Sequence, residues 1–247
     1  EIFKIPEYLQ RMVDNKWLGQ KSKQGFYKKI DKGVIHSINL DSLEYSPQNK
    51  KRYAGIRMAK EHTWSGDRIK ALIHSSDTAG QFVWDITSRA LLYSACRLNE
   101  IADDIVNIDR AMRWGFGWEI GPFEVWDAIG VSESIERMKV ENKSIPEWIS
   151  TMLANGHNSF YKHLDGVQCY WDINKEDYLS IPTSPKELRF SNFKYNGGLI
   201  KDHWSASVVD MGDEVVGVDF HSVLKADLNP IDGSILQTLF QAKDWVH

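Results

Sequence analysis

The sequence has only two cysteines among 247 residues, Cys96 and Cys169. Two cysteines cannot build a disulfide framework, so a reducing compartment is the expected location and the chain is predicted to be cytoplasmic. The chain also lacks a basic excess, because its formal net charge is −4 and its pI is about 6.1. This charge provides no long-range attraction to nucleic acid or to an anionic membrane, so neither is expected as a partner.

Long hydrophobic runs and metal-binding patterns are missing as well. No stretch approaches the roughly 18 apolar residues of a membrane span, and no signal peptide opens the chain, so we expect no membrane span. No His-Glu-x-x-His pattern, cysteine cluster or calcium-loop spacing occurs, so no metal site is expected. The chain begins with Glu1 and not with Met, which we interpret as a sign of a segment cut from a longer protein, with processing as the alternative.

What the chain does contain is typical of a soluble globular protein that is mainly α-helical. Hydrophobic residues make up 42% and charged residues 26%, and the ten tryptophans indicate an indole-rich core. The strongest helical pattern runs from Asp77, a predicted N-cap, to Arg97. Its apolar positions recur every three or four residues, at Phe82, Ile86, Ala90 and Tyr93. Further helices are predicted over 99–114, 121–129, 132–142 and 146–154, and from about 234.

Two short β-hairpins interrupt the helices, at about 26–38 and 206–220. Each consists of two apolar runs around a glycine-containing turn, at 31–33 and at 212–214. A two-stranded ribbon is marginal alone, so we expect the hairpin at 206–220 to be covered by another part of the protein.

An internal repeat connects the two ends of the helical region. Residues 5–8, Met12, Asn15 and residues 26–28 are echoed by residues 145–148, Met152, Asn155 and residues 160–162. The offset is 140 for the first block and 134 for the last. Such spacing favours duplicated domains.

Two motifs resemble the C-terminal domain of 3-hydroxyacyl-CoA dehydrogenases. Residues 21–27 (Lys-Ser-Lys-Gln-Gly-Phe-Tyr) resemble that domain's closing signature, K-T-G-x-G-F-Y. Residues 100–105, 108–112 and 115–124 resemble its glycine-rich block, approximately D-I-D-x-A-M-x-x-G-x-G-x-P-x-G-P-F, and depart at Glu119, where the family often has Pro. Residues 207–222 are similar, less specifically, to the opening hairpin of an enoyl-CoA hydratase (crotonase) domain. The order resembles a bacterial group of long bifunctional β-oxidation enzymes.

This resemblance implies a domain organisation. Residues 1–40 would end a first dehydrogenase C-terminal domain, 41–76 would be a connector, and 77–173 would form a second such helical domain. Residues 174–203 would be another connector, and 204–247 would begin a hydratase-like domain. The expected fold of the helical domain is that of the 6-phosphogluconate dehydrogenase C-terminal domain.

The resemblance also implies a function for the longer protein. That protein would oxidise 3-hydroxyacyl-CoA in fatty-acid β-oxidation, with NAD as cofactor and acyl-CoA as substrate. The present chain would be a non-catalytic scaffold or dimerisation region, a possible homodimer, whose partners are the nucleotide-binding and crotonase domains. The alternative is a self-standing assembly or dimerisation module for acyl-CoA enzymes. The flanking coding sequence distinguishes the two.

No residue of this chain is assigned a catalytic, cofactor-binding or metal-binding role. Gly115, Gly117 and Gly121 fail the dinucleotide fingerprint, because position 120 is Ile and a helix precedes them where a strand is required. We interpret them as a turn between helices, with Pro122 opening the next one. None of the histidines stands in the His-Phe-Phe-Asn-Pro-like motif of the family's catalytic base, and surface or connector positions are expected for all of them: 36, 62, 74, 157, 163, 203, 221 and 247.

Several charged residues were weighed as alternatives. Paired carboxylates among residues 103–104, Asp109 and Asp127 are conceivable, but we expect Asp109 to cap a helix beginning at Arg110. Asp103 and Glu100 are expected to be solvated or paired with an arginine. The basic stretch is interpreted as a solvated hairpin, with steering of acyl-CoA as the alternative; it comprises lysines 16, 21, 23, 28, 29, 32, 50 and 51 and Arg52.

Two further groups complete the expectations. Lys225 and Asn229 lie where a crotonase would begin to line its CoA pocket, but its acid/base glutamates and oxyanion-hole amides would lie beyond this chain. Five tryptophans are interpreted as core or as a helical dimer face: 84, 114, 118, 126 and 148.

Overall fold

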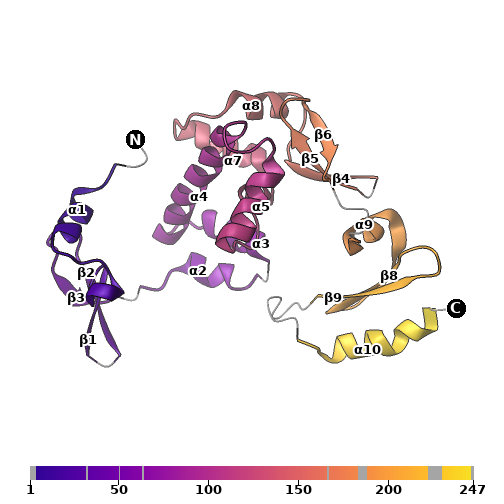
Figure 1. Cartoon of the computed structure of the whole chain (residues 1–247), viewed down its shortest axis with the longest axis horizontal. Helices are drawn as coiled ribbons and strands as arrows, with labels where there is room; N and C mark the ends of the chain where they lie inside the picture. Colours follow the sequence, from indigo (N-terminus) through magenta and orange to yellow (C-terminus); the bar gives the residue numbers. More distant parts are fainter. Residues whose placement is uncertain are drawn as a thin grey trace. The chain divides into compact units, whose positions relative to one another are not determined.

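A computed structural model describes residues 4–31, 33–49, 51–62, 64–165, 167–182, 188–221 and 230–245. The chain divides into two compact units, Glu1–Arg52 and Tyr53–His247, called the amino-terminal and carboxy-terminal units below. Each unit is described by itself (Figure 1). Among the described residues, no helix is both long enough and apolar enough to cross a bilayer.

The amino-terminal unit is one helix followed by a small sheet. Helix α1 spans Glu7–Asp14 and is followed by the short 3-10 turn η1, Gln20–Ser22. Strands β1 (Tyr27–Asp31), β2 (Val34–Ile38) and β3 (Tyr45–Pro47) form an antiparallel sheet in the order β1-β2-β3. The predicted hairpin is confirmed, and a third strand extends it.

The carboxy-terminal unit begins with a helical body. Its helices are α2 (Ala54–Ala59), α3 (Ser65–Ile73), α4 (Thr78–Arg97), α5 (Ile105–Phe116), α6 (Pro122–Ile129), α7 (Val131–Val140) and α8 (Glu147–Ala154). Helix α6 contacts α3, α4, α5 and α7 and therefore lies at the centre of the body. Its residues Phe123 and Trp126 have no exposed surface and belong to one apolar core with α4, α5, α7 and α8.

A second small sheet packs on the helical body. Strands β4 (Tyr161–Leu164), β5 (Val167–Asp172) and β6 (Asp177–Ser180) are antiparallel in the order β4-β5-β6. The sheet contributes Phe160 (0% exposed) and Trp171 (2% exposed) to the same core. This sheet was not predicted, because its central strand buries three consecutive residues, Cys169, Tyr170 and Trp171, and so lacks the alternation of a half-buried strand.

The remaining segment contains a third sheet. Helix α9 (Phe190–Phe193) and the π-helical turn η2 (Lys194–Gly198) lead into β7 (Leu199–Asp202), β8 (Ala206–Asp210) and β9 (Val216–Phe220). Helix α10 (Gly233–Ala242) contacts β8 and β9 and precedes the 3-10 turn η3 (Lys243–Trp245). The predicted hairpin is confirmed: β7 covers one edge and α10 packs on it through Ile235 and Thr238, which are fully buried.

Both expected connectors carry regular structure, which corrects the sequence-based expectation. Residues 41–76 contain β3, α2 and α3, and residues 174–203 contain β6, α9 and β7. The polar, proline-containing composition of both stretches is typical of loops. Tertiary packing stabilises short elements of this kind, which have three to nine residues here, more than local propensity does.

Helix α4 confirms the predicted segment, but most of the recurring apolar positions are not the residues that it buries. The Asp77 carboxylate accepts a hydrogen bond from the Gly80 N–H at 2.9 Å, so it is the N-cap. The residues that α4 buries are Gly80, Trp84, Ser88, Leu91 and Ala95. Three of the recurring apolar residues, Phe82, Ile86 and Tyr93, are 64%, 52% and 42% exposed. We call these three residues the exposed stripe of α4. Large apolar side chains therefore also lie on the outer side of α4, beside the exposed ion pair between Arg89 and Asp85.

Candidate functional site

The glycine-rich segment is a turn between α5 and α6, as predicted. Asp104 caps the start of α5 by accepting the Asn107 N–H at 2.7 Å. Gly117 ends the helix in the left-handed region at φ 69°, a conformation that glycine adopts at least cost. Gly121 then precedes Pro122, the first residue of α6.

Asp109 caps a helix, but a different one from the helix expected. It lies inside α5, is 2% exposed, and its carboxylate accepts the N–H groups of Phe123 and Glu124 at 2.9 and 3.0 Å. Those donors belong to the first turn of α6. Asp109 is therefore a tertiary cap that joins α5 to α6, which no local pattern could reveal.

Asp127 makes the equivalent connection from α6 to the second sheet. Its two carboxylate oxygens accept the N–H groups of Phe160 and Tyr161, each at 2.7 Å. The Tyr161 hydroxyl donates to Asp109 at 3.0 Å, so one strand start bridges both carboxylates. We call Asp109, Asp127 and Tyr161 the carboxylate node.

Burial dominates the electrostatics of this node. It raises the pKa of the Asp109 carboxyl to about 7, although the hydrogen bonds from Phe123, Tyr161 and Glu124 act in the opposite direction. Burial likewise raises the pKa of Asp127 to about 7, against the N–H donors of Phe160 and Tyr161. The pKa of Tyr161 is also raised, by burial and then by the Asp109 charge. The carboxylate oxygens are engaged by the protein's own donors, which is the chemistry of a structural link.

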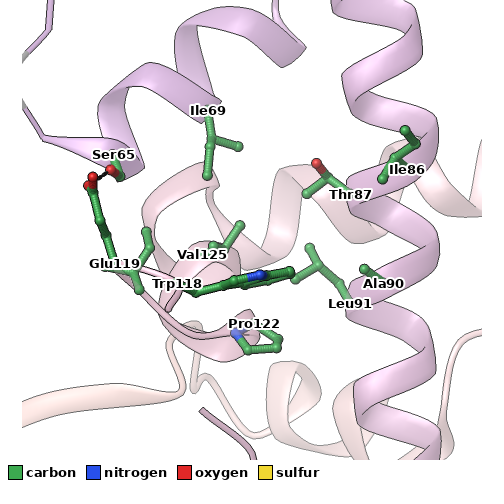
Figure 2. A pocket seen from close by; sticks show the side chains of 11 residues that line it. Ser65, Ile69, Ile86, Thr87, Ala90, Leu91, Trp118, Glu119, Pro122 and Val125 are labelled. Carbon is green, nitrogen blue, oxygen red and sulfur yellow. Dashed lines mark hydrogen bonds between the residues drawn. The ribbon is translucent and has the colours of Figure 1, made fainter. Parts of the chain in front are cut away.

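An apolar pocket of about 290 Å³ opens on another side of the helical body. It is lined by Ile69 of α3, by Ile86, Thr87, Ala90 and Leu91 of α4, and by residues of the α5–α6 turn and α6. In Figure 2 the Trp118 ring, seen edge-on, extends across the pocket toward Leu91 and Ala90 of α4. A hydrogen bond from Ser65 to Glu119 closes one rim.

The pocket continues into the exposed stripe of α4. Ile86 belongs to both, and Trp118, which lines the pocket, is 41% exposed. An apolar hollow next to an uncovered apolar helix face is suited to receive an apolar ligand or another protein surface. Polar groups that could orient a reacting molecule are few there, because Ser65 and Glu119 bond to each other.

The five tryptophans divide into core residues, as expected for some of them, and residues with exposed surface. Trp84 and Trp126 are core residues, at 3% and 0% exposure, and Trp148 packs beside Phe160. Trp114 is 76% exposed and, with Trp118, belongs to the outer surface.

The histidines within the described residues do not form a dehydrogenase-type base with a glutamate. The one with a carboxylate nearby is His221, whose Nε2 lies 2.7 Å from Ser207 Oγ and 3.7 Å from Asp202. Sequence reasoning missed this Ser-His-Asp group. It is not a nucleophilic triad, because Ser207 is 1% exposed and donates directly to Asp202 at 2.7 Å.

The remaining candidates do not converge on a site. Among the described lysines of the basic stretch, Lys16, Lys21, Lys23, Lys29 and Lys51 are exposed, and Lys28 lies over the Tyr45 ring. Glu100 pairs with Arg97 at 2.6 Å, as expected, and Asp103 is exposed. Lys225, Asn229, Lys32, Lys50 and His247 lie outside the described residues. Within the described ranges, no group of three His, Cys, Asp or Glu residues could hold a metal ion.

The described residues do not fit a nicotinamide dinucleotide. That cofactor requires a parallel strand, a glycine turn and a helix in succession. Every strand pair in the described part of the chain is antiparallel, and the glycine-rich turn joins two helices. No chemical step through such a cofactor is derived from these residues.

Comparisons with known proteins agree with these observations. Residues 82–159 match the family described as 3-hydroxyacyl-CoA dehydrogenase, C-terminal domain. A "probable 3-hydroxyacyl-CoA dehydrogenase" of Bacillus subtilis (strain 168) is 41% identical over 222 residues, which are 90% of this chain and 28% of that protein. No solved structure matches the chain significantly.

Two more distant relatives are each named "putative fatty acid oxidation complex trifunctional enzyme". The protein of Rickettsia felis is 28% identical over 120 residues, 47% of this chain and 15% of its own length. That of Rickettsia prowazekii is 24% identical over 127 residues, 50% of this chain and 16% of its own length. The chain thus spans less than a third of each relative. Residues 82–159 thus match the 3-hydroxyacyl-CoA dehydrogenase C-terminal domain, and most of the chain is similar to part of a longer protein named as a probable dehydrogenase of that type.

Proposed function

We propose that the chain is a non-catalytic helical scaffold within a longer NAD-dependent 3-hydroxyacyl-CoA dehydrogenase of fatty-acid β-oxidation. The single observation that carries the proposal is the match of residues 82–159 to the dehydrogenase C-terminal domain, extended by 41% identity over 222 residues. The oxidation itself then belongs to a nucleotide-binding domain elsewhere in the polypeptide. The described part of this chain supplies rigid helices and an apolar face.

The domain limits follow from the same reasoning. Residues 1–40 end a first dehydrogenase C-terminal domain and residues 77–173 form most of a second one. The structure supports adding β6 to that second domain, because Tyr178 is buried in its core. Residues 204–247 begin a domain of the enoyl-CoA hydratase type, in which a hairpin is followed by α10.

The exposed stripe of α4 is the scaffold's contact face. Several large apolar side chains exposed along one helix face mark an interaction surface. Phe82, Ile86 and Tyr93, with the pocket that Trp118 lines, therefore meet another domain of the same polypeptide or a second copy of it. This face is the feature that also favours the alternative function, a self-standing dimerisation module for acyl-CoA enzymes.

The proposal is tested by a comparison of two polypeptides. The 247-residue chain and the longer polypeptide encoded around it are each mixed with NAD and a 3-hydroxyacyl-CoA, and NADH formation is followed by absorbance. The longer polypeptide is expected to form NADH and the 247-residue chain to form none. Turnover by the short chain, or none by the longer polypeptide, would contradict the proposal. A gene that encodes only these residues would favour the self-standing module.

A further inference from the structure

The two copies of the internal sequence repeat have the same structure, a helix followed by a three-stranded antiparallel sheet. Helix α1 and sheet β1-β2-β3 correspond to helix α8 and sheet β4-β5-β6. Both helices start directly after a proline, Pro6 and Pro146, and both end at an asparagine, Asn15 and Asn155.

Backbone hydrogen bonds place the two copies in register. The N–H of Trp17 donates to the Met12 carbonyl at 2.8 Å, and the N–H of His157 donates to the Met152 carbonyl at 3.0 Å. At the first strand, the Ile38 N–H donates to the Phe26 carbonyl at 3.0 Å. In the same position of the other copy, the Trp171 N–H donates to the Phe160 carbonyl at 2.8 Å.

The two copies differ in what covers them. Phe160 is 0% exposed and lies 5.1–5.8 Å, between ring centres, from Phe123, Trp126 and Trp148. Its counterpart Phe26 is 47% exposed, and Tyr27, the counterpart of Tyr161, is 61% exposed.

The carboxylate that accepts two strand N–H groups in the covered copy has no described counterpart in the exposed copy. In the covered copy, the Asp127 carboxylate at the end of α6 accepts the N–H groups of Phe160 and Tyr161. In the described part of the chain, neither the Phe26 N–H nor the Tyr27 N–H meets a carboxylate. A hollow of about 710 Å³ lies beside these residues, lined also by Gly19, Gly25 and Ile35.

We propose that the exposed face at Phe26 and Tyr27 is a docking surface for one occupant, a helix that carries a carboxylate in its last turn. That carboxylate would accept both N–H groups, as Asp127 does, while aromatic or aliphatic residues of the helix cover the Phe26 ring. The occupant is the helical segment directly before residue 1 in the longer polypeptide. The covered copy supports this assignment, because its own helical body directly precedes α8 in sequence.

This inference deepens the proposed duplication of the dehydrogenase C-terminal domain and rests on it. It adds a chemical requirement, because a purely apolar helix would leave two strand N–H groups at the edge of the sheet without an acceptor.

Backbone amide hydrogen exchange tests the inference, residue by residue, in the 247-residue chain and in the longer polypeptide. The amides of Phe160 and Tyr161 are expected to exchange slowly in both proteins. Those of Phe26 and Tyr27 are expected to exchange at least tenfold more slowly in the longer polypeptide than in the short chain. Equal exchange in both proteins would overturn the proposal.

Matched variants identify the acceptor. Asp127→Asn should speed exchange of Phe160 and Tyr161 and leave Phe26 and Tyr27 unchanged. In the longer polypeptide, Asn at the corresponding helix-ending carboxylate should have the reverse effect, and failure of this reversal would contradict the acceptor. Protection of Phe26 in the short chain that grows with concentration, together with a dimer in sedimentation, would assign the face to a second copy and overturn the stated occupant. NADH formation is measured separately, so failure of the proposed activity leaves the exchange result interpretable.

Discussion

Single side chains hold the helical body and its sheet together. Asp109 and Asp127 accept four backbone N–H groups between them, from α6 and from the start of β4. Replacing either by Asn would place an amide group opposite one of two N–H donors and leave that donor without an acceptor. The node therefore gives the buried turn its geometry and also makes stability depend on pH.

We predict that the carboxylate node makes the protein less stable as pH rises toward 8. Each carboxyl has a pKa near 3.8 in the unfolded chain and about 7 in the folded chain. The folded state therefore holds more protons between those values, so this contribution is complete below about pH 4 and is lost as pH rises through about 7. Urea unfolding at about pH 5.5 and pH 8 measures the difference. Asp109→Asn and Asp127→Asn should each flatten it; a wild-type stability that rises with pH would contradict the assignment.

The repeated phenylalanines provide a second prediction at this scale. Phe160→Ala removes a fully buried ring and should lower the free energy of unfolding of the carboxy-terminal unit by about 3–5 kcal/mol. Phe26→Ala removes a ring that is 47% exposed, and its cost in the 247-residue chain should stay within about 1 kcal/mol. Denaturant unfolding of both variants tests the pair. Similar costs would mean that Phe26 is already covered in this chain.

At the scale of elements, helix ends with local signals were predictable. Asp77, Gly117 and the Gly121–Pro122 pair mark helix boundaries through chemistry that acts within a few residues, and the structure confirms all three. The sheet β4-β5-β6 was not predicted, although residues 160–162 correspond in the internal repeat to residues 26–28, where a strand was predicted. Its strands are held by core contacts of Trp171 and Tyr178 more than by their own pattern.

Replacement by alanine is predicted to have opposite effects at Gly115, inside α5, and at Gly121, directly before α6. A Cβ at Gly121 would lie 2.3 Å from the Asp109 Cβ and 2.5 Å from its Cα, so Gly121→Ala should destabilise the fold by about 1–3 kcal/mol. Gly115 lies inside α5 and a Cβ there meets nothing within 4 Å. Gly115→Ala should therefore stabilise the helix by about 0.5–1 kcal/mol. The unfolding temperatures of both variants test these predictions. An unchanged unfolding temperature for Gly121→Ala would contradict the close contact between Gly121 and Asp109.

At the scale of the whole molecule, two apolar surfaces of the described residues remain uncovered. The exposed stripe of α4 and the face at Phe26 both present large apolar side chains. A large apolar core lies behind α4, whereas that core includes no described residue of the amino-terminal unit. A protein that works as part of a larger polypeptide is expected to expose such faces when its neighbours are absent.

We predict that the α4 stripe drives self-association of the isolated 247-residue chain. Phe82→Glu combined with Ile86→Glu should lower the association constant at least tenfold, measured by sedimentation velocity over a range of concentrations, because it places charge on the contact face. Val140→Glu, at a site that is 83% exposed on α7, is the matched control and should change nothing. Association that survives the double substitution would place the contact on another surface.

The sequence alone determined features whose causes are local: helix caps, glycine turns, two hairpins, and the motifs that resemble the dehydrogenase domain. Only the tertiary structure decided which side of α4 is buried and where the oxygens of Asp109 and Asp127 are used. The reason is physical, because an apolar residue is equally apolar on either face of a helix, and a carboxylate accepts whichever N–H the fold brings to it. The carboxylates of Asp109 and Asp127 meet backbone N–H groups 14 to 34 positions away along the chain, and the buried side of α4 meets side chains 55 and 57 positions away.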